Sequence, residues 1–291
     1  MRSALGVPHN RFTDPVLGPI LRRRWRQQLV EAVHSIQPDL LLVTKGNWVD
    51  EQSIHEAKRF SRVTANYYPD GPFHAPNWNP ELERAIRAYD VFFTFSPSFI
   101  PRLVSIGARP ACLPFAWDPE MHPPIDLDRQ PECEVSFVGN WSPERELWLR
   151  QLAGFNLEIW GHWHHLPKSS PLRAFVKGPA QMEADMSRTL ARSAISLNLI
   201  QVFANGHNMR SFEAAAMGAF VLSRRTPELI ELFVEGQEIE CFESPGELVA
   251  KVRRFLADPA ARHRIAEAAR NRCATETYRR RCEQILARCF P

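Results

Sequence analysis

The chain has 291 residues, 44% hydrophobic and 24% charged, with a formal net charge of +3 at pH 7. These values are typical of a soluble globular protein long enough for two domains, and so small a charge does not indicate a nucleic-acid partner. No apolar run approaches the roughly 20 residues that span a bilayer, and the N-terminus has no apolar core of a signal peptide.

The six cysteines show no Cys-x-x-Cys spacing and no dense framework. Several lie within apolar segments, which favours buried thiols over disulfides. Since thiols persist where the surroundings are reducing, we expect a cytoplasmic protein.

The first predicted element is an amphipathic helix, because Leu21, Trp25, Leu29 and Val33 recur at i, i+4 spacing. Continuous apolar runs then predict strands buried in a parallel sheet, at Leu40–Thr44, Val63–Tyr67, Val91–Phe95 and Ala111–Phe115. No strand with a glycine-containing turn precedes that helix. We therefore expect an N-terminal domain over residues 1–122 that is either shortened or begins upstream of Met1.

Asp70 follows the second of these strands, in the run Tyr67-Tyr68-Pro69-Asp70-Gly71. A carboxylate at the end of a strand can orient or deprotonate an acceptor hydroxyl. A turn at Pro69 explains the same residues equally well. His74 is a weaker candidate, and Lys45, which also ends a strand, is expected to line a cleft.

A proline-rich segment, Asp118–Glu132, is the predicted linker to a second domain over residues 132–275. Five further apolar runs predict the strands of that domain, at Val135–Val138, Leu157–Trp160, Ile195–Leu199, Ala219–Ser223 and Ile239–Phe242.

Helix starts in both domains are marked by a capping residue followed by proline, whose missing N–H is not needed at the first helical position. These pairs begin at Asn79, Ser142, Thr226, Ser244 and Asp258.

Gly139 and Asn140 form the predicted turn after the strand that ends at Val138, and Arg145 lies in the first turn of the following helix. Such a position faces the crevice at the carboxyl edge of a sheet, where a guanidinium stabilises a departing diphosphate. A surface salt bridge with Glu144 or Glu146 is the alternative for Arg145.

The run Gly161-His162-Trp163-His164-His165 matches no standard zinc spacing, so we expect no metal there. An ordinary loop or a contact with the donor base or sugar explains it better. Gly-x-Gly-x-x-Gly, P-loop and Gly-x-Ser-x-Gly motifs are also missing from the sequence, which argues against a dehydrogenase, an NTPase and a serine hydrolase.

The most informative segment begins at Asn208, a predicted N-cap, and ends at Gly218, a predicted C-cap. Arg210 and Glu213 lie one turn apart at the start of this helix. Backbone N–H groups and the helix dipole favour a phosphate there, and Glu213 can accept two ribose hydroxyls. Arg210 is a second candidate for stabilising the departing diphosphate. This pattern predicts a nucleotide-sugar site.

From Val249 to Pro291 the sequence has 11 Lys or Arg residues against 4 Asp or Glu, an excess of 7. Solvated helix faces explain this excess best, and at most a peripheral membrane contact is expected. The closing helix, from Tyr278 to about Cys289, lies in the region 276–291 that is expected to cross back onto the first domain.

Three segments together resemble the CgeB-like glycosyltransferases of the GT-B superfamily, named after a spore maturation protein. They are Asn208-Met-Arg-Ser-Phe-Glu, Phe137-Val-Gly-Asn-Trp-Ser-Pro-Glu-Arg145 and Tyr68-Pro-Asp-Gly71. The resemblance covers roughly residues 35–285. It implies an α/β protein with two Rossmann-like domains whose parallel sheets face a central cleft.

The resemblance also implies roles for individual residues. Glu213 would bind the ribose, as the glutamate of the matching Glu-Ala motif does in retaining enzymes, and Asp70 matches the acidic motif of the acceptor-side domain. Asn205 stands where the retaining pattern has a second glutamate; an amide can hydrogen-bond sugar hydroxyls but carries no charge.

We therefore expect a metal-independent glycosyltransferase without a cofactor, which uses a UDP- or GDP-linked sugar and retains the anomeric configuration. The acceptor is open among a protein, a polysaccharide, a lipid and a small metabolite. Two alternatives are a nucleotide-sugar epimerase on the same fold and a non-catalytic sugar- or partner-binding subunit.

Overall fold

The computed structural model of the chain describes residues 13–74, 77–128, 130–179, 181–201 and 206–291, with side chains from residue 23 onward. Two compact units make up the chain. The first comprises residues 1–114 and 286–291, and the second comprises residues 115–285. Each unit has its own hydrophobic core.

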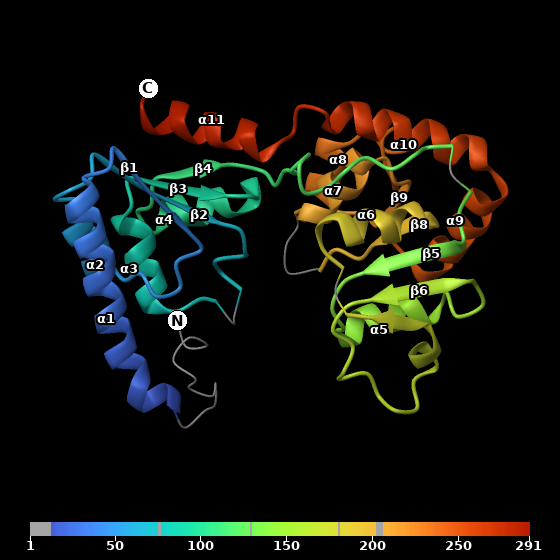
Figure 1. The fold of residues 1–291 in the computed structure, drawn as a ribbon, viewed down its shortest axis with the longest axis horizontal. Helices are drawn as coiled ribbons and strands as arrows, with labels where there is room; N and C mark the ends of the chain where they lie inside the picture. Colours follow the sequence, from blue (N-terminus) through green and yellow to red (C-terminus); the bar gives the residue numbers. More distant parts are fainter. Residues whose placement is uncertain (1–12, 75–76, 129, 180, 202–205) are drawn as a thin grey trace. The chain divides into compact units, whose positions relative to one another are not determined.

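The first unit contains a parallel four-stranded sheet whose strands follow the order β1-β2-β3-β4. Its strands are β1 (Leu40–Thr44), β2 (Val63–Tyr68), β3 (Val91–Thr94) and β4 (Pro110–Cys112). Its helices are α1 (Thr13–Ile36), α2 (Glu51–Ala57), α3 (Pro80–Ala88) and α4 (Ile100–Ser105), and α1 and α2 lie side by side (Figure 1). Tyr68, Ile86 and Phe92 are central to the core, against which Trp25 and Leu29 of α1 pack. The apolar spacing in α1 therefore marks its buried side.

The second unit contains a parallel six-stranded sheet in the order β10-β9-β8-β5-β6-β7. Its strands are β5 (Cys133–Val138), β6 (Leu157–Trp160), β7 (Val176–Gly178), β8 (Ser193–Asn198), β9 (Val221–Arg224) and β10 (Glu240–Phe242). The chain runs outward from β5 to β7, returns to β8 beside β5, and then runs outward to β10. The strand order therefore reverses between β5 and β8, which is where open α/β sheets bind ligands.

The helices of the second unit are α5 (Pro143–Arg150), α6 (Glu183–Ala191), α7 (Met209–Met217), α8 (Pro227–Leu232), α9 (Pro245–Ala257) and α10 (Pro259–Cys273). Figure 1 shows α10, in red, beside α9 and close to α7. Val252, Phe255 and Ile265 of α9 and α10 join the sheet residues Val135, Ile159 and Ile195 in one core. The last helix, α11 (Tyr278–Cys289), divides between the units at Leu286.

All nine predicted strands are present, with ends shifted by a few residues, and the continuous apolar runs are those of parallel sheets as expected. The prediction missed β7, whose three residues Val176, Lys177 and Gly178 are too short and too polar for an apolar pattern. The five capping residues followed by proline are all confirmed, since each side chain accepts a hydrogen bond from a backbone N–H of its own helix.

The proline-rich segment that we predicted to be a linker lies within the second unit, because the two units divide between Pro114 and Phe115. Ile125 is buried, its N–H donates to the carbonyl of Met217 at 2.8 Å, and Arg270 donates to its carbonyl. These contacts hold the segment against α7 and α10. Proline content alone therefore did not identify a free linker.

Candidate functional site

Helix α7 begins at the carboxyl end of β8, and two asparagines hold it there. Asn208 is the N-cap, and its Oδ1 accepts a hydrogen bond from the N–H of Ser211 at 3.1 Å. The amides of Asn208 and Asn198, the last residue of β8, also exchange hydrogen bonds of 2.9 and 3.1 Å. Helix geometry leaves the N–H groups of Met209 and Arg210 without a partner inside the helix. Since Met209 is 48% exposed, this end of the helix is not sealed within the core.

The other end of α7 matches its prediction. Gly218 has a φ of 91°, in the left-handed region, and its N–H returns to the carbonyl of Ala215. The small residues Ala214, Ala215 and Ala216 are completely buried, which allows close packing beside α10. The helix is thus fixed at both ends with its start at the edge of the sheet.

Arg145, in the first turn of α5, bridges the two loops at the point where the strand order reverses. Its Nη1 donates to the carbonyl of Asn140 after β5 at 2.9 Å, and its Nη2 donates to the carbonyl of Leu199 after β8 at 3.3 Å. Its Nε is enclosed and has no acceptor among the described residues. Burial lowers the pKa of this guanidinium, which nevertheless remains a cation at neutral pH.

The salt-bridge alternative for Arg145 is not what the structure shows, because Glu144 pairs with Arg224 and Glu146 pairs with Arg150. Arg145 instead presents a buried positive charge at the switch point. A diphosphate is the kind of group that such a charge and a helix N-terminus attract together.

Gly139 and Asn140 form the turn after β5, as predicted, and a close approach to the next loop constrains that turn. The carbonyl of Gly139 accepts from the indole of Trp163 at 2.9 Å, and Asn140 Oδ1 accepts from the N–H of His162 at 3.1 Å. Gly161 has a φ of 150°, and a Cβ there would lie 2.1 Å from the Gly139 carbonyl oxygen. Only glycine fits that position.

The same packing indicates a structural role for the histidine-rich loop, residues 161–165. Trp163 is buried in the core. The ring centroids of His164 and His165 lie 4.0 Å apart, so these two side chains contact each other. Across the described residues, no group of three or more His, Cys, Asp or Glu side chains is placed to hold a metal ion. The loop therefore supports the Gly139–Asn140 turn.

Arg210 and Glu213 form an ion pair of 3.0 Å, with the guanidinium donating to Oε2 of the carboxylate. Both side chains are mostly buried, with exposed fractions of 19% and 11%. Burial lowers the pKa of Arg210, and the charge of Glu213 opposes that effect. Arg210 thus donates to a carboxylate of its own helix. Its predicted role, to stabilise the departing diphosphate, stays a prediction.

The sequence reasoning missed two residues beside Glu213. His122, from the proline-rich segment, places its Nε2 3.7 Å from Glu213 Oε1. Tyr278 begins α11, and burial, with a smaller contribution from the charge of Glu213, raises the pKa of its hydroxyl to about 12. Neither lies in a motif, so only the tertiary structure could reveal them.

Asp70 lies in the first unit, just beyond the end of β2, and forms an ion pair with Lys45, which follows β1. Both groups stand at the carboxyl edge of that sheet, because β1 and β2 are parallel. Burial and the charge of Asp70 raise the pKa of Tyr68 to about 12. Asn205, the other predicted site residue, lies outside the described residues.

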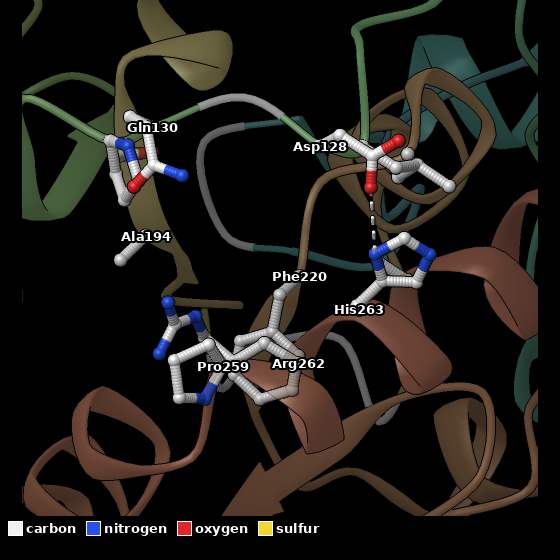
Figure 2. Close-up of a pocket in the computed structure, with 12 residues that line it drawn as sticks. Asp128, Gln130, Ala194, Phe220, Pro259, Arg262 and His263 are labelled. Atoms are coloured by element: carbon white, nitrogen blue, oxygen red, sulfur yellow. Dashed lines mark ion pairs between the residues drawn. The ribbon is translucent and has the colours of Figure 1, made fainter.

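A cavity of about 380 Å³ lies at the opposite edge of the second sheet (Figure 2). Ala194 at the start of β8, Phe220 before β9 and Pro259 of α10 line it, and His263 and Asp128 lie next to each other on one side of it, 3.7 Å apart. Because parallel sheets bind ligands at their carboxyl ends, this cavity is not part of the candidate site.

In a comparison with known protein families, one family model matches the C-terminal part of the chain. Residues 144–287 match the family model described as glycosyl transferase-like. This range contains Arg145, Asn208, Arg210 and Glu213. No curated protein matches the chain.

Solved structures share the whole fold at low sequence identity. A sucrose-phosphate synthase from Thermosynechococcus elongatus has a TM-score of 0.67 at 14% identity, over 97% of this chain and 80% of its own. HepE from Anabaena, solved with UDP-glucose, has a TM-score of 0.69 at 14% identity, over 90% and 81% of the two chains. A glycosyltransferase from Rickettsia africae has a TM-score of 0.64 at 11% identity, over 93% and 81%. The two parallel α/β units are therefore those of the GT-B fold, in a chain shorter than these neighbours.

Proposed function

We propose, from the premise that residues 144–287 are a glycosyl transferase-like domain, that the chain transfers a sugar from a nucleoside diphosphate to an acceptor. The observation that carries this proposal is the position of Arg145. Its guanidinium joins the loops after β5 and β8 at the switch point of the sheet, where α7 also begins. Two sources of positive charge therefore converge at the switch point.

The proposed chemistry follows from these charges. Cleavage of the sugar–phosphate bond builds negative charge on the departing diphosphate, and fixed cations and amides lower that barrier. Arg145 and the first N–H groups of α7, beside Asn208, would bind the diphosphate, with Gly139 and Asn140 shaping the turn next to it. Glu213 would accept the ribose hydroxyls, and Arg210 would orient Glu213. The reaction would then need no metal ion and no cofactor.

The remaining assignments stay proposals that rest on the CgeB-like resemblance. Asn205 would contact the sugar, Asp70 would address the acceptor, and the anomeric configuration would be retained. Asp70 pairs with Lys45, which holds its carboxylate in one place and supports an orienting role. The acceptor is proposed to be a protein, a polysaccharide, a lipid or a small metabolite.

The donor is proposed to be a UDP-sugar or a GDP-sugar. HepE, one of the structural neighbours, was solved in complex with UDP-glucose and with UDP, which supports testing UDP-sugars first. We also propose a cytoplasmic location, which the six free thiols support, without a nucleic-acid partner. Within the described ranges, every helix is too short or too polar to cross a membrane.

Incubation of the full chain with UDP- and GDP-sugars, with and without candidate acceptors, tests the proposal. Release of UDP or GDP with a sugar-bearing product is the expected result. Glu213→Ala should weaken nucleotide binding measurably and leave the fold intact. Isomerised donor without release would indicate an epimerase, and binding without turnover would indicate a non-catalytic subunit. Either result would contradict transfer.

A further inference from the structure

The carboxylate of Glu213 is held from two sides within the second unit. Arg210, on the same helix, donates to Oε2, while His122 faces Oε1 from a segment that precedes α7 by many residues. His122 and Glu213 are 7% and 8% exposed. Arg210 and Glu213 are three positions apart on one helix, so helical spacing alone makes them neighbours. The contact with His122 has no such explanation, because His122 lies on another segment.

The hydrogen bonding of His122 fixes which of its nitrogens faces Glu213. Its Nδ1 lies 3.1 Å from the carbonyl oxygen of Asp118, which can only accept, so Nδ1 carries a hydrogen. Nε2 is therefore the nitrogen that faces Glu213 Oε1, at 3.7 Å. When Nε2 carries a hydrogen, this edge of the ring is a donor toward the carboxylate.

Further charged and titratable groups complete the surroundings of this pair. Tyr278 of α11 interacts with both Glu213 and Asp118, and its hydroxyl hydrogen-bonds the backbone of Ala116. Arg210 contributes a cation. Arg210 and His122 thus contact the carboxylate from two sides, which leaves its other lone pairs available to hydroxyl donors.

We propose that His122 is a positioning residue of the donor site, which holds the Glu213 carboxylate in the orientation that accepts the two ribose hydroxyls of a nucleoside diphosphate. This inference rests on the proposed function, because it assigns Glu213 to the ribose. Without His122, the carboxylate is free to rotate toward Arg210 and to pair with it through both oxygens. The ribose hydroxyls would then meet a carboxylate turned away from them.

The test compares two ligands that differ only at the ribose. UDP and GDP are titrated into the full-length wild type and the His122→Ala variant by calorimetry, beside their 2′,3′-dideoxy analogues. We expect His122→Ala to weaken binding of the ribonucleotide about tenfold, the effect of one hydrogen bond or ion pair of ordinary strength, and to leave binding of the dideoxy analogue unchanged. A general loss of structure would weaken both ligands alike.

Two further variants complete the design. His122→Gln keeps an N–H donor near the position of Nε2 and should restore most of the affinity for the ribonucleotide. His263→Ala is the matched control, because His263 also lies 3.7 Å from a carboxylate, that of Asp128, but at the opposite edge of the sheet. It should bind both ligands as the wild type does.

Each remaining outcome overturns the inference. Equal losses for both ligands would show that His122 only supports the fold, and no loss would show that Glu213 does not depend on it. A wild type that binds UDP or GDP without preferring the ribonucleotide would remove Glu213 from the ribose. Failure to bind either nucleotide would overturn the proposed function, and the inference with it.

Discussion

Arg145 and Arg210 have the same side chain but different hydrogen-bond partners, and this difference suggests different roles. The Arg145 guanidinium donates to two backbone carbonyls and lies over the ring of Phe137, whereas the neighbouring Glu144 pairs with Arg224. The Arg210 guanidinium pairs with the Glu213 carboxylate. We therefore propose that Arg145 stabilises the departing diphosphate and that Arg210 orients Glu213.

Replacement of Arg145 by glutamine should remove the charge at the switch point and preserve much of the side-chain length. A hydrogen bond to a charged group contributes about 1.5–3 kcal/mol, so the affinity for UDP should fall by about tenfold to a hundredfold. Calorimetric titration measures this loss. Arg188→Gln, at an exposed arginine of α6, is the control and should not change the affinity. Equal affinities for wild type and Arg145→Gln would exclude Arg145 from the site.

At the scale of elements, the turn after β5 is shaped by the loop after β6. Trp163 donates to the Gly139 carbonyl, and Gly161 lets the two backbones approach closely. The loop after β6 therefore constrains the shape of the turn after β5, which is part of the proposed donor site. The contact also explains why a tryptophan lies between the histidines of this loop.

Gly161→Ala should disturb this turn. The added methyl group would overlap the Gly139 carbonyl, and alanine rarely adopts a φ of 150°, so the backbone must shift. Overpacking of this kind costs about 1–3 kcal/mol, which should lower the melting temperature by several degrees and weaken UDP binding. Gly154→Ala is the control, because a Cβ there meets no atom within 4 Å. A Gly161→Ala variant as stable as that control would contradict the described loop contact.

Elements with local signals could be predicted from the sequence, whereas contacts between distant segments could not. Asn208 and Gly218 mark the ends of α7 through their own backbone preferences, and the structure places both where expected. The Ser244 cap is also confirmed, since its hydroxyl accepts a hydrogen bond from the N–H of Glu247. His122 and the Gly139–Trp163 contact depend on how the chain returns to α7 and β5, which no short pattern encodes.

At the scale of the whole molecule, polar side chains lie at the carboxyl ends of the parallel strands in each unit. The first sheet presents Lys45 and Asp70, and the second presents Asn198 and the start of α7. The proline-rich segment belongs to the second unit, so His122 lies in the same unit as the residues of the proposed donor site. The sequence predicts the strands of the second sheet but not their order, so the reversal between β5 and β8 is known only from the structure.

A crystal structure of the full chain with UDP is the measurement that tests this account most directly. We expect the diphosphate within hydrogen-bonding distance of the Arg145 guanidinium and the first N–H groups of α7, with the ribose hydroxyls on Glu213. UDP bound instead in the cavity at the amino ends of β8 and β9, or on the first unit alone, would contradict the assignment of the donor site.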